Sequence, residues 1–106
     1  MNFKISKSPI DSPLKINMND WQVYLLRCSD QTLYCGITNN IDARLKTHNA
    51  GKGARYTRGR LPVEIIETSE KMTRSDALKL ERVIKKLPKT RKISALIDSR
   101  INPNQF

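Results

Sequence analysis

The sequence predicts an α+β fold in which helices flank a small three-stranded antiparallel sheet, in the order β-β-α-β-α-α. Two short stretches of alternating apolar residues, 21–27 and 33–37, are separated by a turn signal, which is typical of a hairpin. A third stretch, 63–67, follows a proline and predicts another strand. The segments between and after the strands carry apolar residues at helical spacing. A chain of 106 residues accommodates one such domain.

The first two strands form the predicted hairpin. Alternation along the first strand sends Val23 and Leu25 to one face of the sheet and Tyr24 to the other. The Ser29-Asp30-Gln31 turn then returns the chain antiparallel. This hairpin brings Tyr24 near Tyr34 on the second strand, and the sequence leaves open whether the two rings share a face.

The first predicted helix covers 41–49 and carries two candidate functional residues. Asn39 or Asn40 can cap it, because an asparagine side chain accepts a hydrogen bond from an early helical N–H group. Arg44 and His48 are four residues apart, so they share one face of this helix.

A second predicted helix begins after Thr73, where Thr73-Arg74-Ser75-Asp76 resembles a capping box. Pro88 ends this helix, and a last helix is predicted over 90–98. Glu81 lies on the apolar side of the second helix, among Ala77, Leu80, Ile84 and Leu87.

We expect one ordered domain over 20–99, a flexible N-terminal tail over 1–19 and a C-terminal tail over 100–106. The first tail contains prolines and serines but no apolar run of the kind that a secretory signal needs. Met18 lies just before the first strand, so a start at Met18 is an alternative to a start at Met1.

The charge balance predicts a polyanionic partner. Lys and Arg total 20 against 10 Asp and Glu, a formal net charge of +10. DNA is the expected partner, with RNA as the alternative, since the sequence has no apolar run long enough to cross a membrane. A basic protein with no active site would still bind nucleic acid with a dissociation constant of roughly 10⁻⁴ to 10⁻⁶ M.

The cysteines predict a reducing compartment. Cys28 and Cys35 do not form a C-x-x-C pair, and a single histidine is too few for a typical structural zinc site. We therefore expect both to be buried, reduced thiols, which suits a cytoplasmic protein.

Arg44 and His48 have two interpretations. They form either a solvated helix face that binds phosphate passively, or a reactive pair. In the second case Arg44 grips a scissile phosphate and His48 moves a proton or binds the phosphate.

Glu81 also has two interpretations, because carboxylates are rare within an apolar stripe. Glu81 either forms an edge ion pair with Lys85, four residues later, or is a metal ligand. A lone carboxylate is compatible with Mg²⁺, which keeps several waters when protein-bound.

Tyr24 and Tyr34 are either packing residues or reactive phenols. A free phenol has a pKa of about 10, so lowering it towards 7 needs about 4 kcal/mol of preference for the phenolate. Nearby cations such as Arg44, the basic loop and a bound metal are candidates to supply that preference.

The segment 51–60 predicts a glycine-rich basic loop without acidic residues. Glycines allow close approach to phosphates, and an aromatic ring can stack on a base. The alternative is an ordinary surface loop. The candidate nucleic-acid-binding residues in it are Lys52, Arg55, Tyr56, Arg58 and Arg60.

These residues together resemble the GIY-YIG nuclease family. The resemblance extends over 21–97, and Gly53-Ala54-Arg55-Tyr56-Thr57 looks like the small stand-alone bacterial members. The motif residues are Val23-Tyr24, Tyr34-Cys35-Gly36-Ile37-Thr38, Arg44, His48 and Glu81. Two positions depart from the family pattern: Gln22 replaces the first glycine, and Cys35 replaces the usual isoleucine.

The resemblance implies a role for each motif residue. Tyr24 would help to activate the attacking water, and Tyr34 would hold the nucleophile or the phosphate. Arg44 would stabilise the charge that develops on the phosphate, while His48 assists proton movement. Gly36 would permit close packing at the strand end, within the motif that Thr38 completes.

The resemblance also implies a cofactor and a reaction. Glu81 would hold a single Mg²⁺ or Mn²⁺, and the 20–99 domain would be a metal-dependent endonuclease that hydrolyses DNA, including branched or damaged DNA in repair or recombination. The alternatives are a catalytically silent or weak nucleic-acid-binding module with the same fold, and a basic RNA-binding protein. A protein partner that supplies substrate targeting would fit a chain without an attached DNA-targeting domain.

Overall fold

A computed structural model describes residues 19–101 of the chain. Three strands form one sheet: β1 (Gln22–Arg27), β2 (Leu33–Thr38) and β3 (Glu64–Thr68). Both β2 and β3 pair with β1 in antiparallel fashion, so the strand order is β2-β1-β3 and β2 lies at an edge. The predicted fold class is confirmed.

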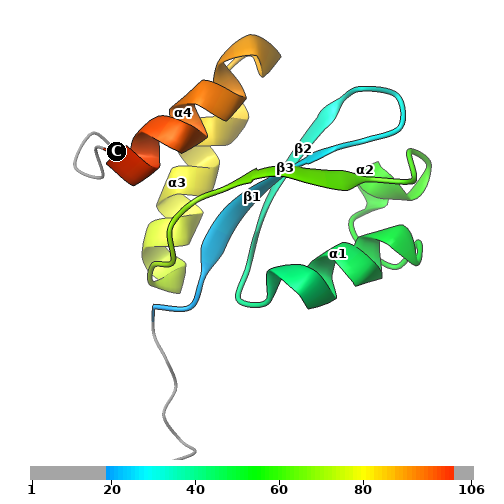
Figure 1. Cartoon of the computed structure of the whole chain (residues 1–106), viewed down its shortest axis with the longest axis horizontal. Coiled ribbons are helices and arrows are strands. Elements are labelled where there is room, and N and C mark those ends of the chain that lie inside the picture. Colours follow the sequence, from blue (N-terminus) through cyan, green and yellow to red (C-terminus); the bar gives the residue numbers. More distant parts are fainter. Residues whose placement is uncertain (1–18, 102–106) are drawn as a thin grey trace, which may run out of the picture.

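Four helices cover the two faces of the sheet. They are α1 (Ile41–Asn49), α2 (Arg55–Arg58), α3 (Arg74–Lys86) and α4 (Lys89–Ile101). Figure 1 shows α3 and α4 on one side of the strands and α1 and α2 on the other. The sheet therefore forms a middle layer with a different helix pair on each face.

The structure adds one element to the predicted order. The segment 51–60, which the sequence predicts to be a loop, contains the single helical turn α2. In this turn the Thr57 N–H donates to the carbonyl of Ala54 at 3.0 Å. One turn is too short to produce an apolar period, and the flanking glycines favour a loop prediction.

The helix ends differ modestly from the predicted ones. Helix α4 continues to Ile101, so Arg100 and Ile101, predicted to begin a C-terminal tail, are helical. The predicted N-terminal tail lies outside the described residues except for Asn19, and so does the rest of the C-terminal tail.

Side-chain caps begin two of the helices. Asn40, not Asn39, caps α1, where its Oδ1 accepts from the Ala43 N–H at 3.1 Å. Thr73 caps α3 by accepting from the Asp76 N–H at 3.1 Å. Each cap satisfies an N–H group that has no partner within the helix.

The hairpin register settles which residues share a face. Tyr24 lies opposite Gly36, and Leu26 lies opposite Tyr34. Because neighbours two apart on a strand point to the same side, Tyr24 and Tyr34 share a face, with ring centroids 6.3 Å apart.

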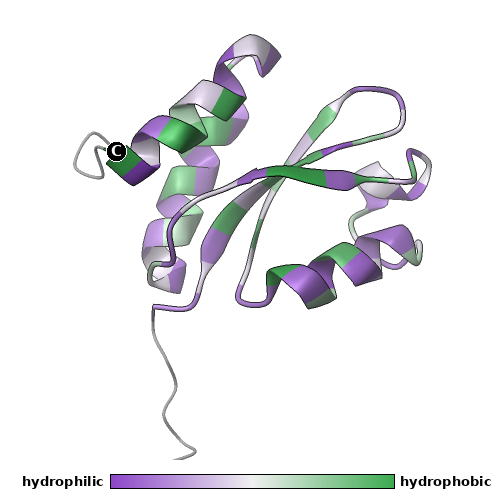
Figure 2. Ribbon diagram, in the orientation of Figure 1, coloured by the Kyte–Doolittle hydropathy of each residue, from purple (hydrophilic) through white to green (hydrophobic). Residues whose placement is uncertain are grey.

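The core consists of two clusters, one on each face of the sheet. The cluster beneath α3 and α4 is apolar and contains Val23, Leu25, Cys35, Ala77, Leu80, Ile84 and Leu96. The cluster beneath α1 contains Tyr24, Leu26, Cys28 and Val63. Figure 2 shows apolar residues along the strands, and apolar residues alternating with polar ones on α1, α3 and α4.

Two further findings concern burial and length. Both cysteines are buried, free thiols, as predicted.

Within residues 19–101, none of the helices has the length and apolar character that crossing a membrane requires.

Candidate active site

Tyr24 is at the centre of a buried polar network on the α1 face of the sheet. Only 1% of this residue is exposed. Its Oη is 2.9 Å from His48 Nε2 and accepts a hydrogen bond from Arg44 Nε at 3.3 Å. Arg44 and His48, one turn apart on α1, therefore converge on a single phenol oxygen.

His48 is fully buried, with 0% of the residue exposed. Its Nδ1 is 2.9 Å from Oγ1 of Thr57, which is also fully buried. The interpretation of His48 as part of a solvated helix face is therefore wrong. The sequence could not show this, because the group that covers His48 comes from α2, which periodicity did not predict.

Two glycines lie directly against this network. A Cβ at Gly36 would be 2.6 Å from Tyr24 Oη, and a Cβ at Gly53 would overlap His48 Nδ1 and lie 2.9 Å from His48 Cα. Contacts this short leave no room for a side chain. The packing partner of Gly36 is thus the catalytic candidate Tyr24 itself.

Burial sets the protonation states in the network. Desolvation raises the pKa of Tyr24 above its ordinary value of 10.0, and the hydrogen bond from Arg44 opposes this only partly. Desolvation, with the charge of Arg44, lowers the pKa of His48 below 6.5. The hydrogen bond to Tyr24 raises the pKa of Arg44. At neutral pH the network contains a neutral phenol, a neutral imidazole and a guanidinium cation.

These shifts bear on one hypothesis. Nearby cations were candidates to lower the pKa of Tyr24, but in the protein alone desolvation is the larger effect and raises it. A neutral Tyr24 can still act if its proton has an acceptor within hydrogen-bond distance. His48 Nε2 is at that distance.

Tyr34 connects the network to the surface. Its ring is 5.4 Å from the His48 ring and stacks on Tyr56, with centroids 6.1 Å apart and planes at 25°. The Arg60 guanidinium lies 4.0 Å from the centre of the exposed Tyr56 ring. A shallow depression of about 360 Å³ covers this edge, lined by Leu33, Tyr34, Cys35, Tyr56, Lys85 and Lys92.

Two basic residues of the segment 51–60 make hydrogen bonds within the fold. Arg60 pairs with Asp30 at 3.0 Å and donates to the Tyr56 carbonyl, and Arg58 donates to the Gly53 carbonyl at 3.3 Å. Lys52, Arg55 and Arg58 are exposed. Two of the predicted DNA-binding cations therefore also hold the segment in shape.

Glu81 does not join the polar network directly. It is on α3, which packs on the opposite face of the sheet, and its side chain, 18% exposed, pairs with Lys85 at 3.3 Å. It is close to β2, since desolvation and then its charge raise the pKa of Cys35 to about 12. The depression at the β2 edge includes Lys85, so it connects the surroundings of Glu81 with Tyr34.

The donor set near Glu81 suits only a loosely held metal. Residues 19–101 contain no cluster of three or more His, Cys, Asp or Glu that could enclose an ion. One partly exposed carboxylate is compatible with Mg²⁺ or Mn²⁺ that keeps its waters and binds substrate phosphates as well. Glu81 offers one carboxylate for such an ion, and Lys85 competes for the same oxygens.

Thr38 has a structural position. Its hydroxyl accepts from the Asn40 N–H at 3.1 Å and thereby shapes the connection from β2 to α1. Thr57 and Gly53 were not predicted as site residues, although both are in the motif-like stretch of segment 51–60. The sequence signal that could have identified them is their spacing from His48: Gly53 is a small residue five positions later, and Thr57 has a hydroxyl nine positions later.

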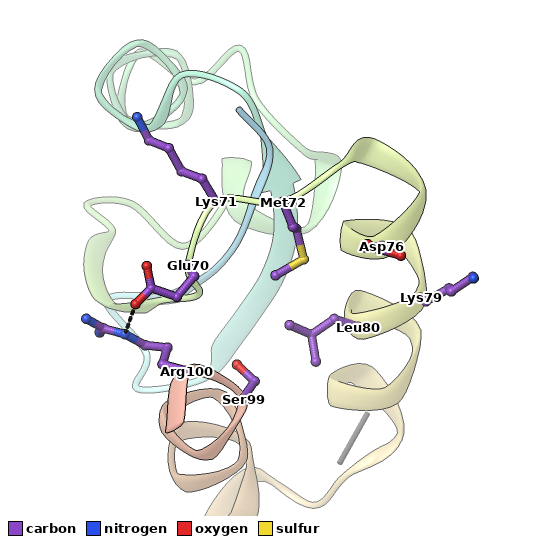
Figure 3. A pocket seen from close by; sticks show the side chains of 8 residues that line it. All are labelled: Glu70, Lys71, Met72, Asp76, Lys79, Leu80, Ser99 and Arg100. Carbon is purple, nitrogen blue, oxygen red and sulfur yellow. Dashed lines mark ion pairs between the residues drawn. The ribbon is translucent and has the colours of Figure 1, made fainter. Parts of the chain in front are cut away.

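A second cavity, of about 420 Å³, lies away from all of these groups. It is between α3, α4 and the segment before α3, and Figure 3 shows Met72 and Leu80 pointing into it while Lys71 and Lys79 point away. Its Arg100 is engaged by Glu67 at 2.7 Å and by Glu70 at 3.8 Å. None of the predicted site residues lines it.

Comparisons with known proteins agree with the motif assignment. A model of the GIY-YIG catalytic domain matches residues 20–94. A UPF0213 protein of Nitratidesulfovibrio vulgaris is 50% identical over 76 residues, which cover 72% of this chain and 69% of that protein. A UPF0213 protein of Oceanobacillus iheyensis is 47% identical over 74 residues, or 70% and 86% of the two chains.

A solved structure is similar as well. The solution NMR structure of a protein from E. faecalis has a TM-score of 0.52 and 38% sequence identity, and the match covers 76% of this chain and 86% of that one.

Proposed function

Because the chain belongs to the GIY-YIG family, we propose that it is a metal-dependent endonuclease that hydrolyses phosphodiester bonds in DNA. One observation supports this proposal most: Arg44 and His48 meet at the buried Tyr24 hydroxyl, at 3.3 and 2.9 Å. A protein that only binds nucleic acid needs surface cations, not a buried phenol and imidazole in contact.

The proposed chemistry is hydrolysis by an activated water. The water attacks phosphorus and gives a proton to Tyr24 Oη as the Tyr24 proton passes to His48 Nε2. The P–O bond to the leaving oxygen breaks, that oxygen takes a proton from solvent water, and His48 returns its extra proton to solvent, while Arg44 stabilises the charge that develops on the phosphate. Tyr34, at the edge of the network, orients the water or the phosphate.

Glu81 is the proposed metal ligand. A Mg²⁺ or Mn²⁺ ion bound there would neutralise charge on the leaving oxygen. The protein contribution is one carboxylate, and substrate phosphates and waters would complete the coordination. This need for substrate is consistent with the lone, partly exposed position of Glu81.

The proposed substrate contact surface surrounds Tyr34. Exposed cations lie on the segments around this surface: Lys52 just before α2, Arg55 at the start of α2, and Lys85 near the end of α3. DNA is the proposed partner, including branched or damaged forms, with RNA as the alternative. A separate protein would supply targeting, because the residues of the described domain serve mainly to form the fold and the site.

One observation favours the alternative of a weak or silent binding module. Glu81 pairs with Lys85 and is on the opposite side of the sheet from Tyr24. Unless bound substrate brings a metal ion at Glu81 close to the Tyr24 network, that network has no metal ion to assist it. This alternative predicts salt-sensitive DNA binding without cleavage.

The test is a cleavage assay on plasmid, single-stranded, flap and branched DNAs with Mg²⁺, with Mn²⁺ and with EDTA. We expect cleavage of at least one form that EDTA abolishes and Glu81→Ala removes. Glu64→Ala is the matched control, because Glu64 is also an ion-paired surface glutamate. Cleavage that survives Glu81→Ala would reject the metal ligand, and binding without any cleavage would support the silent module.

A further inference from the structure

The Thr57 hydroxyl makes two contacts that together restrict where protons lie. Its Oγ1 is 2.9 Å from the Ala54 carbonyl and 2.9 Å from His48 Nδ1. A carbonyl can only accept, whereas a hydroxyl has a single proton to donate. If that proton goes to Ala54, Thr57 must accept from His48, and His48 Nδ1 carries the ring proton.

The other end of the imidazole supports the same arrangement. Within residues 19–101, the hydrogen-bond partners of Tyr24 Oη are His48 Nε2 and Arg44 Nε. A guanidinium has no acceptor, so the proton of Tyr24 can be donated only to His48 Nε2. This requires Nε2 to be without a proton.

The opposite tautomer leaves a buried group unsatisfied. If Nε2 carried the proton, Tyr24 Oη would receive hydrogen bonds from both His48 and Arg44, and its own proton would have no acceptor among these groups. In the free protein Tyr24 is 1% exposed, so bulk water does not readily supply the missing acceptor; the attacking water of the proposed reaction reaches Tyr24 Oη only with bound substrate. An unsatisfied buried donor costs about 1–3 kcal/mol, which favours the first arrangement.

We propose that Thr57 is a positioning residue that holds His48 as its Nδ1–H tautomer, with Nε2 free to take the Tyr24 proton. The order of donation is Arg44 to Tyr24 to His48 to Thr57, ending at the carbonyl of Ala54. The catalytic importance of this order rests on the proposed function, whereas the tautomer itself does not. Thr57 thereby makes α2 part of the site without touching substrate.

Gly53 makes this arrangement sterically specific. It approaches the His48 ring so closely that a Cβ would overlap Nδ1. Gly53 therefore packs against the same side of the ring that contacts Thr57, and a larger residue there would disturb that contact. The chain has a single histidine, so the tautomer can be measured without ambiguity in untagged protein.

The first test is a two-bond ¹H–¹⁵N correlation spectrum of the imidazole above pH 7.5, in wild type, Thr57→Ser and Thr57→Val. Wild type and Thr57→Ser should give the Nδ1–H pattern. Thr57→Val removes the acceptor at nearly constant volume and should shift the population towards Nε2–H. A wild-type Nε2–H pattern would overturn the assigned tautomer. An unchanged Nδ1–H pattern in a folded Thr57→Val would show that Tyr24 alone holds the tautomer, and would overturn the positioning role of Thr57.

The second test measures cleavage of whichever DNA the wild type cuts. Thr57→Val should lower kcat by about 10-fold to 100-fold, the usual effect of losing a group that orients a reactive histidine, with DNA binding unchanged. Thr57→Ser should restore most of the rate. Equal rates for both variants would overturn the positioning role while leaving the nuclease proposal intact.

The two tests separate the two proposals. If the protein cuts no DNA, the nuclease proposal fails, and the wild-type spectrum still decides the tautomer. That spectrum needs no variant, so it decides the tautomer even if Thr57→Val does not fold.

Discussion

The two faces of the sheet use the same strand for different purposes. Val23 and Leu25 of β1 point into the apolar cluster beneath α3 and α4. Tyr24, between them, points into the cluster beneath α1 and joins a polar network with His48 and Thr57. Alternation along one strand thus separates the packing that stabilises the domain from the groups proposed to react.

The faces also differ in what burial does. On the α3 face, burial of apolar side chains stabilises the fold directly. On the α1 face, burial raises the pKa of Tyr24 and lowers the pKa of His48, which keeps both neutral beside the Arg44 cation. Substitutions on the first face should therefore change mainly stability, and those on the second mainly cleavage.

The largest expected effect is on the apolar face. Leu25→Ala removes a side chain with 0% exposure and should lower the free energy of unfolding by about 2–5 kcal/mol. Urea denaturation measures this, with Ile101→Ala, at an exposed position, as the control. Cleavage per folded molecule should be unchanged. A large loss of cleavage by fully folded Leu25→Ala would show that the faces are not separate.

The next effect is on the network face. Arg44→Ala should reduce cleavage by about 10² or more, the usual effect of removing one donor to the transition state, with DNA binding only modestly weaker. Steady-state kinetics and a binding isotherm measure the two quantities. Arg82→Ala, at an exposed position of α3, is the control. Equal losses of binding and cleavage would make Arg44 a binding residue only.

A smaller effect compares two glycines of segment 51–60. Gly53→Ala would place a methyl group against His48 and should lower the free energy of unfolding by about 1–3 kcal/mol. It should also lower the rate of cleavage. Gly59→Ala meets nothing within 4 Å, so it should be nearly neutral. Thermal denaturation of both variants measures the difference. Equal stabilities would mean that His48 is free to move away.

The smallest expected effect concerns pH, because it involves one group. The pKa of His48 is lowered in the folded protein, so below pH 6.5 the unfolded chain binds more protons than the folded one. The stability that goes with a neutral His48 is fully present above pH 6.5 and is lost as the pH falls below that value. His48→Gln should therefore show a shallower decline in unfolding free energy over that range. A parallel decline in both proteins would contradict a neutral His48.

The sequence predicted the elements that carry strong local signals. The hairpin, the α1 helix and the α3 helix follow from alternation, caps and apolar spacing, and the structure confirms them. The shared face of Tyr24 and Tyr34 depended on register, which a turn signal alone does not determine.

What the sequence could not predict depended on tertiary contacts. The burial of His48 requires α2, a single turn without a periodic signal, to fold back over α1. The position of Glu81 relative to the network depended on which face α3 covers, and amphipathic spacing does not specify that. The raised pKa of Tyr24 followed from the same burial and was therefore also missed.

The central claim is that the buried Tyr24 hydroxyl transfers the proton in DNA cleavage. Tyr24→Phe removes only that oxygen, and Tyr56→Phe removes the oxygen of an exposed tyrosine near the same edge. Their single-turnover cleavage rates, measured at equal DNA occupancy, test the claim most directly. We expect a loss of about 10² or more for Tyr24→Phe and little change for Tyr56→Phe. A folded Tyr24→Phe that cleaves at the wild-type rate would contradict it.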